Sequence, residues 1–155
     1  MNIQERIEAL ETEFNEKIKA LKAEVQREDE FPQYNDTYYY IESNGRVDWF
    51  KWDEGDYDLE AQGIGNIFRT EEQAEFAAEK LKVEAELRKF SIPFEEDEYN
   101  SFINLYMPDK TVAVDGCMYW QKQGVIYFES DNKAQQAIEA VGEERIKKYI
   151  FGVED

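Results

Sequence analysis

Residues 68–81 read Phe-Arg-Thr-Glu-Glu-Gln-Ala-Glu-Phe-Ala-Ala-Glu-Lys-Leu, and residues 128–141 read Phe-Glu-Ser-Asp-Asn-Lys-Ala-Gln-Gln-Ala-Ile-Glu-Ala-Val. When they are aligned on Phe68 and Phe128, both place an aromatic residue two positions before Thr70 or Ser130, with alanines four and seven positions further on. Thr and Ser are favoured helix N-caps, so each segment predicts a strand end followed directly by a helix. A pattern repeated in this way predicts one structural unit used twice.

An aromatic-rich hairpin is predicted before each segment. In the first, the strongly β-prone residues 37–52 surround Asn44-Gly45, the most frequent short hairpin turn, and residues 66–69 form a further short strand. In the second, turn residues separate three candidate strands, and an apolar run then precedes Glu129. These candidates are residues 101–107, 111–115, 117–122 and 125–128. Gly142 is expected to end the second helix, and a last short helix follows over residues 143–149.

The N-terminal region predicts one amphipathic helix over residues 2–28. It contains no Gly or Pro, and Glu13 precedes Lys17 by one helical turn. Its apolar residues follow steps of 4, 3, 4, 4, 3 and 4, which trace a single stripe: Ile3, Ile7, Leu10, Phe14, Ile18, Leu21 and Val25. The stripe should be buried, either on the chain's own domain or against a second chain as a short coiled coil.

Together these elements predict an α+β fold: an N-terminal amphipathic helix followed by two similar β-hairpin–strand–helix units with small antiparallel sheets. The expected divisions are residues 1–30 for the helix, 31–93 for the first unit and 94–155 for the second. Thr70 and Gln73 form a capping box at the first alanine-rich helix. Its expected buried face comprises Ala74, Ala77, Ala78, Leu81, Ala85 and Leu87.

The charge balance indicates a basic protein partner. The 155 residues include 36 Asp and Glu against 18 Lys and Arg, a net charge of −18. Such a field repels nucleic acid and anionic membranes, so direct contact with either is not expected. It attracts basic protein surfaces, and most of those hold DNA or RNA. Solubility alone would explain a few negative charges, but not so many.

The rare residue types argue against an enzyme. The chain has no histidine and one cysteine, Cys117, which excludes histidine-based catalysis, imidazole zinc sites and intrachain disulfides. Cys117 is expected to be a small buried thiol. Glycine-rich phosphate-binding motifs and nucleophile elbows are absent from the sequence. We therefore expect neither catalytic residues nor a cofactor, and the lack of a signal peptide or membrane span suggests a cytoplasmic protein.

Two acidic runs are the candidate partner-binding residues. The first lies in an expected loop over residues 53–65, and the second is a run between the two units. Their carboxylates are Asp53, Glu54, Asp56, Asp58, Glu60, Glu95, Glu96, Asp97 and Glu98. Loops on a rigid scaffold often carry binding residues.

Other interpretations of these runs stay open. The first could be a solvated loop or a Ca²⁺ site, although its spacing does not fit an EF-hand, so no metal is expected. The second could be a solvated linker. In the preceding strand, Trp49 and Lys51 face one way while Phe50 and Trp52 face the other. One face could expose a ring beside the carboxylates, which would suit an arginine, or both could pack within the hairpin.

Three segments resemble small accessory proteins of phages of Gram-positive bacteria. Residues 65–89 begin Gly-Asn-Ile-Phe-Arg-Thr-Glu-Glu-Gln-Ala, and residues 38–47 read Tyr-Tyr-Tyr-Ile-x-Ser-x-Gly-x-Val. Residues 142–152, Gly-Glu-Glu-Arg-Ile-Lys-Lys-Tyr-Ile-Phe-Gly, are similar to the same group. That group includes anti-CRISPR inhibitors of Cas9-type nucleases, and the resemblance implies an inhibitor of a host defence nuclease.

Two functions follow as hypotheses. The first is an inhibitor that binds a basic nucleic-acid-handling surface, such as that of a Cas9-type nuclease in the host cell, by presenting carboxylates as a DNA mimic. A variant of it blocks a catalytic domain without mimicking DNA. The alternative is a non-enzymatic structural or regulatory accessory protein that forms a homodimer through its N-terminal helix.

Overall fold

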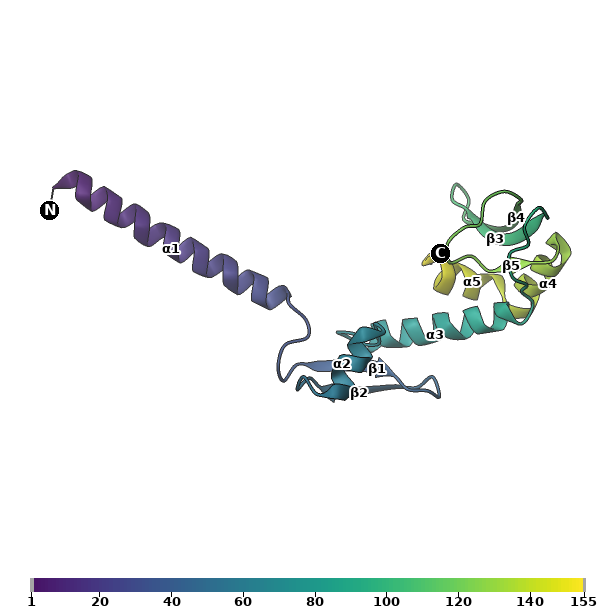
Figure 1. The fold of residues 1–155 in the computed structure, drawn as a ribbon, viewed down its shortest axis with the longest axis horizontal. Helices are drawn as coiled ribbons and strands as arrows, with labels where there is room; N and C mark the ends of the chain where they lie inside the picture. Colours follow the sequence, from purple (N-terminus) through teal and green to yellow (C-terminus); the bar gives the residue numbers. More distant parts are fainter. Residues whose placement is uncertain (1, 155) are drawn as a thin grey trace. The chain divides into compact units, whose positions relative to one another are not determined.

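The computed structural model describes residues 2–154, apart from the side chains of residues 27–29. Its mixed α+β architecture confirms the predicted fold class (Figure 1). The elements in chain order are α1 (Ile3–Asp29), β1 (Thr37–Ile41), β2 (Val47–Lys51), α2 (Asp56–Gly63), α3 (Glu71–Arg88), β3 (Asn100–Tyr106), β4 (Thr111–Cys117), β5 (Tyr127–Phe128), α4 (Asp131–Val141) and α5 (Glu143–Phe151).

Helix α1 begins at a reciprocal cap that the sequence analysis did not identify. The Asn2 side chain accepts a hydrogen bond from the Glu5 backbone N–H, and the Glu5 carboxylate accepts one from the Asn2 N–H, each at 2.8 Å. Further along, Lys17 pairs with Glu13 at 2.6 Å, as their spacing predicts. The apolar stripe of α1 is largely exposed, so its burial on the chain's own domain is not observed.

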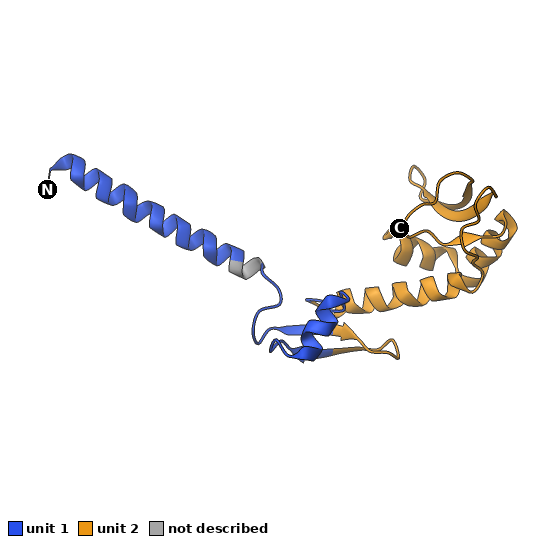
Figure 2. Ribbon diagram, in the orientation of Figure 1, with its two compact units in different colours: residues 1–39, 49–69 blue, residues 40–48, 70–155 orange. Residues whose placement is uncertain are grey.

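The chain divides into two compact units, which Figure 2 colours separately. Unit 1 contains residues 1–39 and 49–69, and unit 2 contains residues 40–48 and 70–155. This division differs from the boundary expected at residue 93. Its physical reason is that α3 contributes Val83 and Leu87 to the same apolar core as α4 and α5. The one helix of the predicted first unit, α3, thus belongs to unit 2.

The first hairpin, β1 with β2, forms as predicted. Tyr39 and Phe68 exchange two backbone hydrogen bonds of 2.9 Å and so form a single antiparallel bridge. The sequence had predicted a short strand over residues 66–69 at this place. The core of unit 1 lies under the hairpin, where Tyr38 packs edge-on against Trp52 with ring centroids 5.9 Å apart. Both rings are buried, together with Ala61 of α2.

Unit 2 contains a three-stranded antiparallel sheet in the order β4-β3-β5. Figure 1 shows α3, α4 and α5 on one side of this sheet. The buried core lies between them and consists of Val83, Leu87, Phe128, Ala134, Ala137, Ile138, Val141 and Ile146. On β3, Ser101 lies opposite Phe128 of the two-residue strand β5. The short strand β5 thereby places the buried ring of Phe128 against the helices.

The repeated sequence pattern corresponds to a repeated local structure. Thr70 accepts a hydrogen bond from the Gln73 N–H at 3.2 Å, and Ser130 accepts one from the Lys133 N–H at 3.1 Å, so both predicted N-caps are present. In each case, the aromatic residue two positions before the cap pairs antiparallel with the first strand of the preceding hairpin. Phe68 does so with Tyr39, and Phe128 does so with Ser101.

Several local predictions were wrong. On α3 the buried side chains are Ala74, Ala78, Val83 and Leu87, whereas Leu81 and Ala85 are exposed, because the helix turns its Val83 face to α4 and α5. Residues 118–122 form no strand, and Tyr119 and Trp120 are exposed there. The stretch instead crosses to β5, with the Lys122 N–H donating to the Tyr127 hydroxyl at 2.6 Å. Cys117 is half-buried rather than buried.

Candidate functional site

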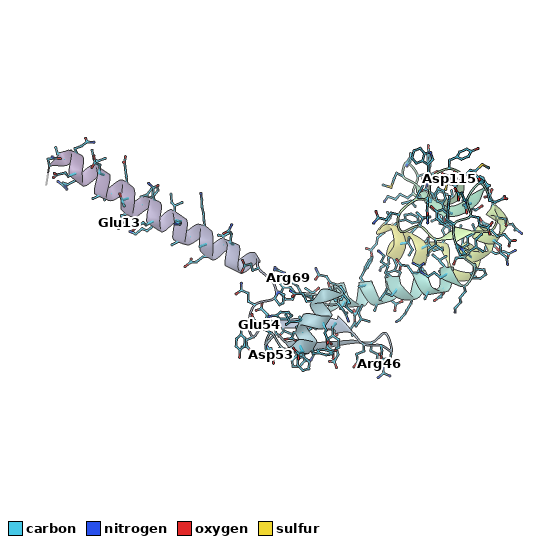
Figure 3. The ribbon with its side chains drawn as sticks, in the orientation of Figure 1. Glu13, Arg46, Asp53, Glu54, Arg69 and Asp115 are labelled. Carbon is cyan, nitrogen blue, oxygen red and sulfur yellow. The ribbon has the colours of Figure 1, made fainter. Side chains whose placement is uncertain are left out.

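The acidic segment of unit 1 is a tight turn followed by a helix, not the loop over residues 53–65 that the sequence suggested. The Gly55 N–H donates to the Asp53 carboxylate at 2.9 Å, and Glu54 has a positive φ of 63°. Gly55 then caps α2, which starts at Asp56. The density of acids and glycines hid this helix, although acids in a first helical turn favour it by opposing the helix dipole. Figure 3 labels Asp53 and Glu54 in the turn that leads into α2.

Four of the five predicted carboxylates of this segment are exposed, namely Asp53, Glu54, Asp56 and Glu60. We call these four residues the hairpin acidic surface. The fifth, Asp58, is only 1% exposed, so its assignment as a partner-facing carboxylate is corrected. It accepts hydrogen bonds from the Tyr38 hydroxyl at 2.6 Å and from the Asp53 backbone N–H at 2.7 Å. Asp58 therefore fastens α2 and the acidic turn to the hairpin core.

The protonation of Asp58 follows from these contacts. Burial alone would raise the pKa of its carboxyl, but hydrogen bonds from Tyr38, Asp53 and Glu54 favour the charged form and together lower the pKa from its ordinary 3.8. A lowered pKa means that the ionised group stabilises the folded state. That contribution is fully present above the unfolded-state value and is lost as pH falls through the folded-state pKa.

Replacing Asp58 by Asn should therefore destabilise unit 1 in a pH-dependent way. The amide keeps the shape but loses the charge, so we expect a loss of about 1–3 kcal/mol at neutral pH. Below pH 3.8 the wild-type protein should approach the variant, because its own Asp58 becomes protonated. Denaturant unfolding across an acid pH series measures both effects. A constant difference between the two proteins at every pH would contradict this role.

Exposed aromatic rings lie next to the hairpin acidic surface. Phe50 of β2 and Tyr57 of α2 are in contact, with ring centroids 6.0 Å apart. Both remain about half exposed, as does Trp49 on the other face of the strand, while Trp52 is buried. Of the two arrangements considered for this strand, unit 1 thus has rings exposed beside carboxylates. A flat ring next to a carboxylate is a favourable environment for an arginine guanidinium.

The second acidic run is also a turn held by hydrogen bonds. Glu95, Glu96, Asp97 and Glu98 are all exposed, and we call them the acidic turn of unit 2. Asn100, which is buried, accepts from the Glu95 N–H and donates to the carbonyls of Glu95 and Glu98, each at 2.8 Å. Sequence reasoning missed Asn100, although an Asn at the start of a strand after an acidic run is a residue type that commonly fixes turns.

Substituting Asn100 by Ala should loosen this turn. Three hydrogen bonds to the backbone are lost, although the Glu95 carbonyl still accepts from the Glu98 N–H, so local opening should become easier by about 1–3 kcal/mol. Hydrogen exchange of the peptide covering residues 92–102 reports this opening directly. Asn100→Asp is a second variant that keeps the acceptor for the Glu95 N–H but places a carboxylate oxygen against the Glu95 and Glu98 carbonyls, so it should loosen the turn as well. Equal protection in all three proteins would show that Asn100 does not hold the turn.

A polar cluster in unit 2 was also missed by the sequence analysis. Ser101 donates to the Asp131 carboxylate at 2.6 Å, which ties β3 to the start of α4. The Tyr99 ring lies so close over Gly116 that a Cβ there would overlap it. Burial, and then the charges of Asp131 and Asp115, raise the pKa of the Tyr99 hydroxyl.

No family model, curated protein or solved structure matches the chain significantly.

The two acidic surfaces consist of carboxylates only. Among the described side chains, those of residues 2–26 and 30–154, no three Asp, Glu or Cys groups come together in a way that would hold a metal ion. In the same part of the chain, none of the eight exposed carboxylates of these surfaces takes part in an ion pair. None of the described helices combines the length and the apolar character needed to span a bilayer. The carboxylates of these two surfaces are therefore available to pair with cations of another molecule.

Proposed function

We propose that this protein is a non-enzymatic inhibitor that binds a basic nucleic-acid-handling surface of another protein, with its carboxylates in place of nucleic-acid phosphates. One observation carries the proposal. Eight exposed carboxylates, in the hairpin acidic surface and the acidic turn of unit 2, stand on defined turns without intrachain ion pairs within residues 2–154. Other glutamates, such as Glu13, Glu79 and Glu86, are paired with cations of the same chain.

The fixed frame of these carboxylates supports the proposal. Asp58 and Asn100 are buried residues whose hydrogen bonds hold the two acidic turns. A surface that is ordered before binding loses less entropy when it binds, which raises affinity. A merely solubilising charge would need no such buried support.

The negative electrostatic field of the whole protein also favours binding to a basic surface. A net charge of −18 raises the rate at which a basic surface is encountered and excludes competing nucleic acid from this protein. Arginines and lysines that line a nucleic-acid channel would meet carboxylates here, and the rings of Phe50 and Tyr57 could stack on an arginine.

The resemblance of residues 38–47, 65–89 and 142–152 to phage accessory proteins directs the choice of target. Cas9-type nucleases hold the guide–target duplex in a positively charged channel and read the PAM through arginines. Carboxylates presented by this protein would occupy those side chains. We therefore place a Cas9-type nuclease first among the candidate targets.

The direct test mixes the protein with a panel of Cas9-type effectors. Guided DNA cleavage and DNA binding are both measured, since a DNA mimic should reduce both, whereas a protein that blocks the catalytic domain should reduce cleavage alone. Charge reversal of the hairpin acidic surface, and separately of the acidic turn of unit 2, identifies the surface used. Undiminished cleavage across the panel would remove this target class.

A second candidate function is a dimerising structural or regulatory accessory protein. The exposed apolar stripe of α1 favours it, because such a stripe commonly pairs with another helix. The two candidates differ in what removal of residues 1–28 should do. Inhibition by carboxylates should survive that removal, while an assembly function should be lost.

A further inference from the structure

Helix α1 carries a continuous apolar face that the structure leaves exposed. Six of its seven apolar residues are between 44% and 75% exposed: Ile3, Ile7, Leu10, Phe14, Leu21 and Val25. Ile18 completes the stripe and is partly exposed. An apolar face of this length along about 33 Å of helix is a face that another helix can cover.

The stripe repeats at every eleventh position rather than as a broken heptad. Ile3 is followed at this interval by Phe14 and Val25, Ile7 is followed by Ile18, and Leu10 is followed by Leu21. Such a period corresponds to about 3.67 residues per turn, close to the roughly 3.6 of a straight helix. Two such helices can stay in contact over the full stripe without the left-handed supercoil that a heptad repeat requires.

The same spacing is symmetric about Phe14, because the steps of 4, 3 and 4 on one side are mirrored on the other. In a pair of antiparallel helices centred on Phe14, each apolar residue meets an apolar residue of the second copy. Ile3 lies level with Val25, Ile7 with Leu21, and Leu10 with Ile18. We propose that α1 forms an antiparallel homodimer with a second copy of this chain, centred on Phe14.

The charges beside the stripe favour this orientation. One flank carries Arg6, Glu13, Lys17 and Glu24, and in an antiparallel pair this flank faces the same flank of the second copy. Arg6 then lies within about two residues, or about 3 Å along the axis, of Glu24 of the second copy. Glu13 lies at the same small offset from Lys17 of the second copy. These four interhelical contacts are attractive, and the one repulsive contact at the same offset is between Glu13 and Glu13 of the second copy.

A parallel pair lacks this complementarity. There the first flank would face the opposite flank, which carries Gln4, Glu11, Asn15 and Lys22. In the usual parallel pairing, with a five-residue offset, Arg6 would meet Glu11, but Lys17 would meet Lys22. Each attractive pair is thus matched by a repulsive one. Flank charges of this kind select the orientation of paired helices.

Pairing in this way would place the C-terminal ends of the two α1 helices at opposite ends of the helix pair. The rest of each chain would then be attached at one end, and the dimer would present two copies of every acidic surface. Two linked copies can bind two sites with an affinity above that of either one. The dimer itself is proposed independently of the inhibitory function.

The first experiment measures the mass of the full chain by sedimentation. The wild type is expected near twice the 18.4 kDa chain mass. Leu10→Glu with Phe14→Glu should give a monomer, because charges enter the centre of the stripe. The matched control, Ala9→Glu with Ala20→Glu, adds the same charge on the outer face and should remain dimeric, with helix content compared by circular dichroism. A monomeric wild type would overturn the proposal.

The second experiment tests the orientation. One variant carries Glu13→Lys and Glu24→Lys, and the other carries Arg6→Glu and Lys17→Glu, so that the same flank becomes wholly basic or wholly acidic. Each alone should dimerise at least about tenfold more weakly than the wild type, and the equimolar mixture should recover dimerisation. Glu8→Lys with Glu16→Lys makes the same change of charge on the outer face, and as a control it should dimerise as strongly as the wild type. A mixture no stronger than its components would overturn the antiparallel arrangement.

Discussion

Reversing Asp53, Glu54, Asp56 and Glu60 to lysine should weaken binding to the basic partner on the order of 100-fold or more. The four carboxylates are exposed and form no ion pair with any described side chain, so their reversal removes attraction and adds repulsion. The reversal also removes the hydrogen bond that the Asp53 carboxylate accepts from the Gly55 N–H. Asp58 is left unchanged, since it supports the turn. Binding is measured by calorimetry or by inhibition of the target nuclease, after circular dichroism has shown that the variant is folded.

A matched set of reversals separates the surface from the general field. Glu8, Glu16, Glu129 and Glu139 are exposed elsewhere in the chain, and their reversal changes the net charge by the same amount. We expect this control to lower the association rate while the dissociation rate stays close to that of the wild type. Equal losses of affinity in both sets would mean that the partner does not bind the hairpin acidic surface specifically.

Truncating Phe128 to Ala should produce the largest loss of stability among single substitutions in unit 2. Its side chain is fully buried at the centre of the core formed with α3, α4 and α5. Removing a buried phenylalanine ring costs about 3–5 kcal/mol through lost burial and the cavity that remains. Denaturant unfolding of the full chain measures the change, with hydrogen exchange to locate it in unit 2.

Phe68 is the matched comparison because it holds the same position in the first repeat. It is only partly buried and pairs with Tyr39 through a single bridge. Its truncation should therefore cost about 1–2 kcal/mol, well below the effect at Phe128. If the order of the two effects were reversed, the core assignment for Phe128 would be wrong.

Local chemistry made much of the fold predictable from the sequence. The N-caps Thr70 and Ser130 act on groups three positions away, and Asn44-Gly45 sets its hairpin through its immediate neighbours. Signals of this range depend little on the rest of the chain. The correspondence between residues 68–81 and 128–141 joined them into two similar units, and the resulting α+β class is confirmed.

The missed features depend on contacts between distant residues. In the sequence, Asp58 is indistinguishable from its acidic neighbours. It is buried because its carboxylate accepts a hydrogen bond from Tyr38, which lies 20 residues earlier. The turn of unit 2 likewise needed Asn100, whose side chain closes it from the first residue of β3. The face of α3 that is buried was set by α4 and α5, which come after the whole of the β4-β3-β5 sheet in the chain. Burial of this kind overrides what periodicity alone predicts.

The most direct test of the account is the salt dependence of binding to the target. If carboxylates of this protein occupy the cations of a nucleic-acid channel, the dissociation constant should rise steeply between about 50 and 500 mM salt, and DNA should compete for the same site. The variant with the reversed hairpin acidic surface should show a shallower dependence. An affinity that is indifferent to salt, or binding that is unaffected by saturating DNA, would contradict the central claim.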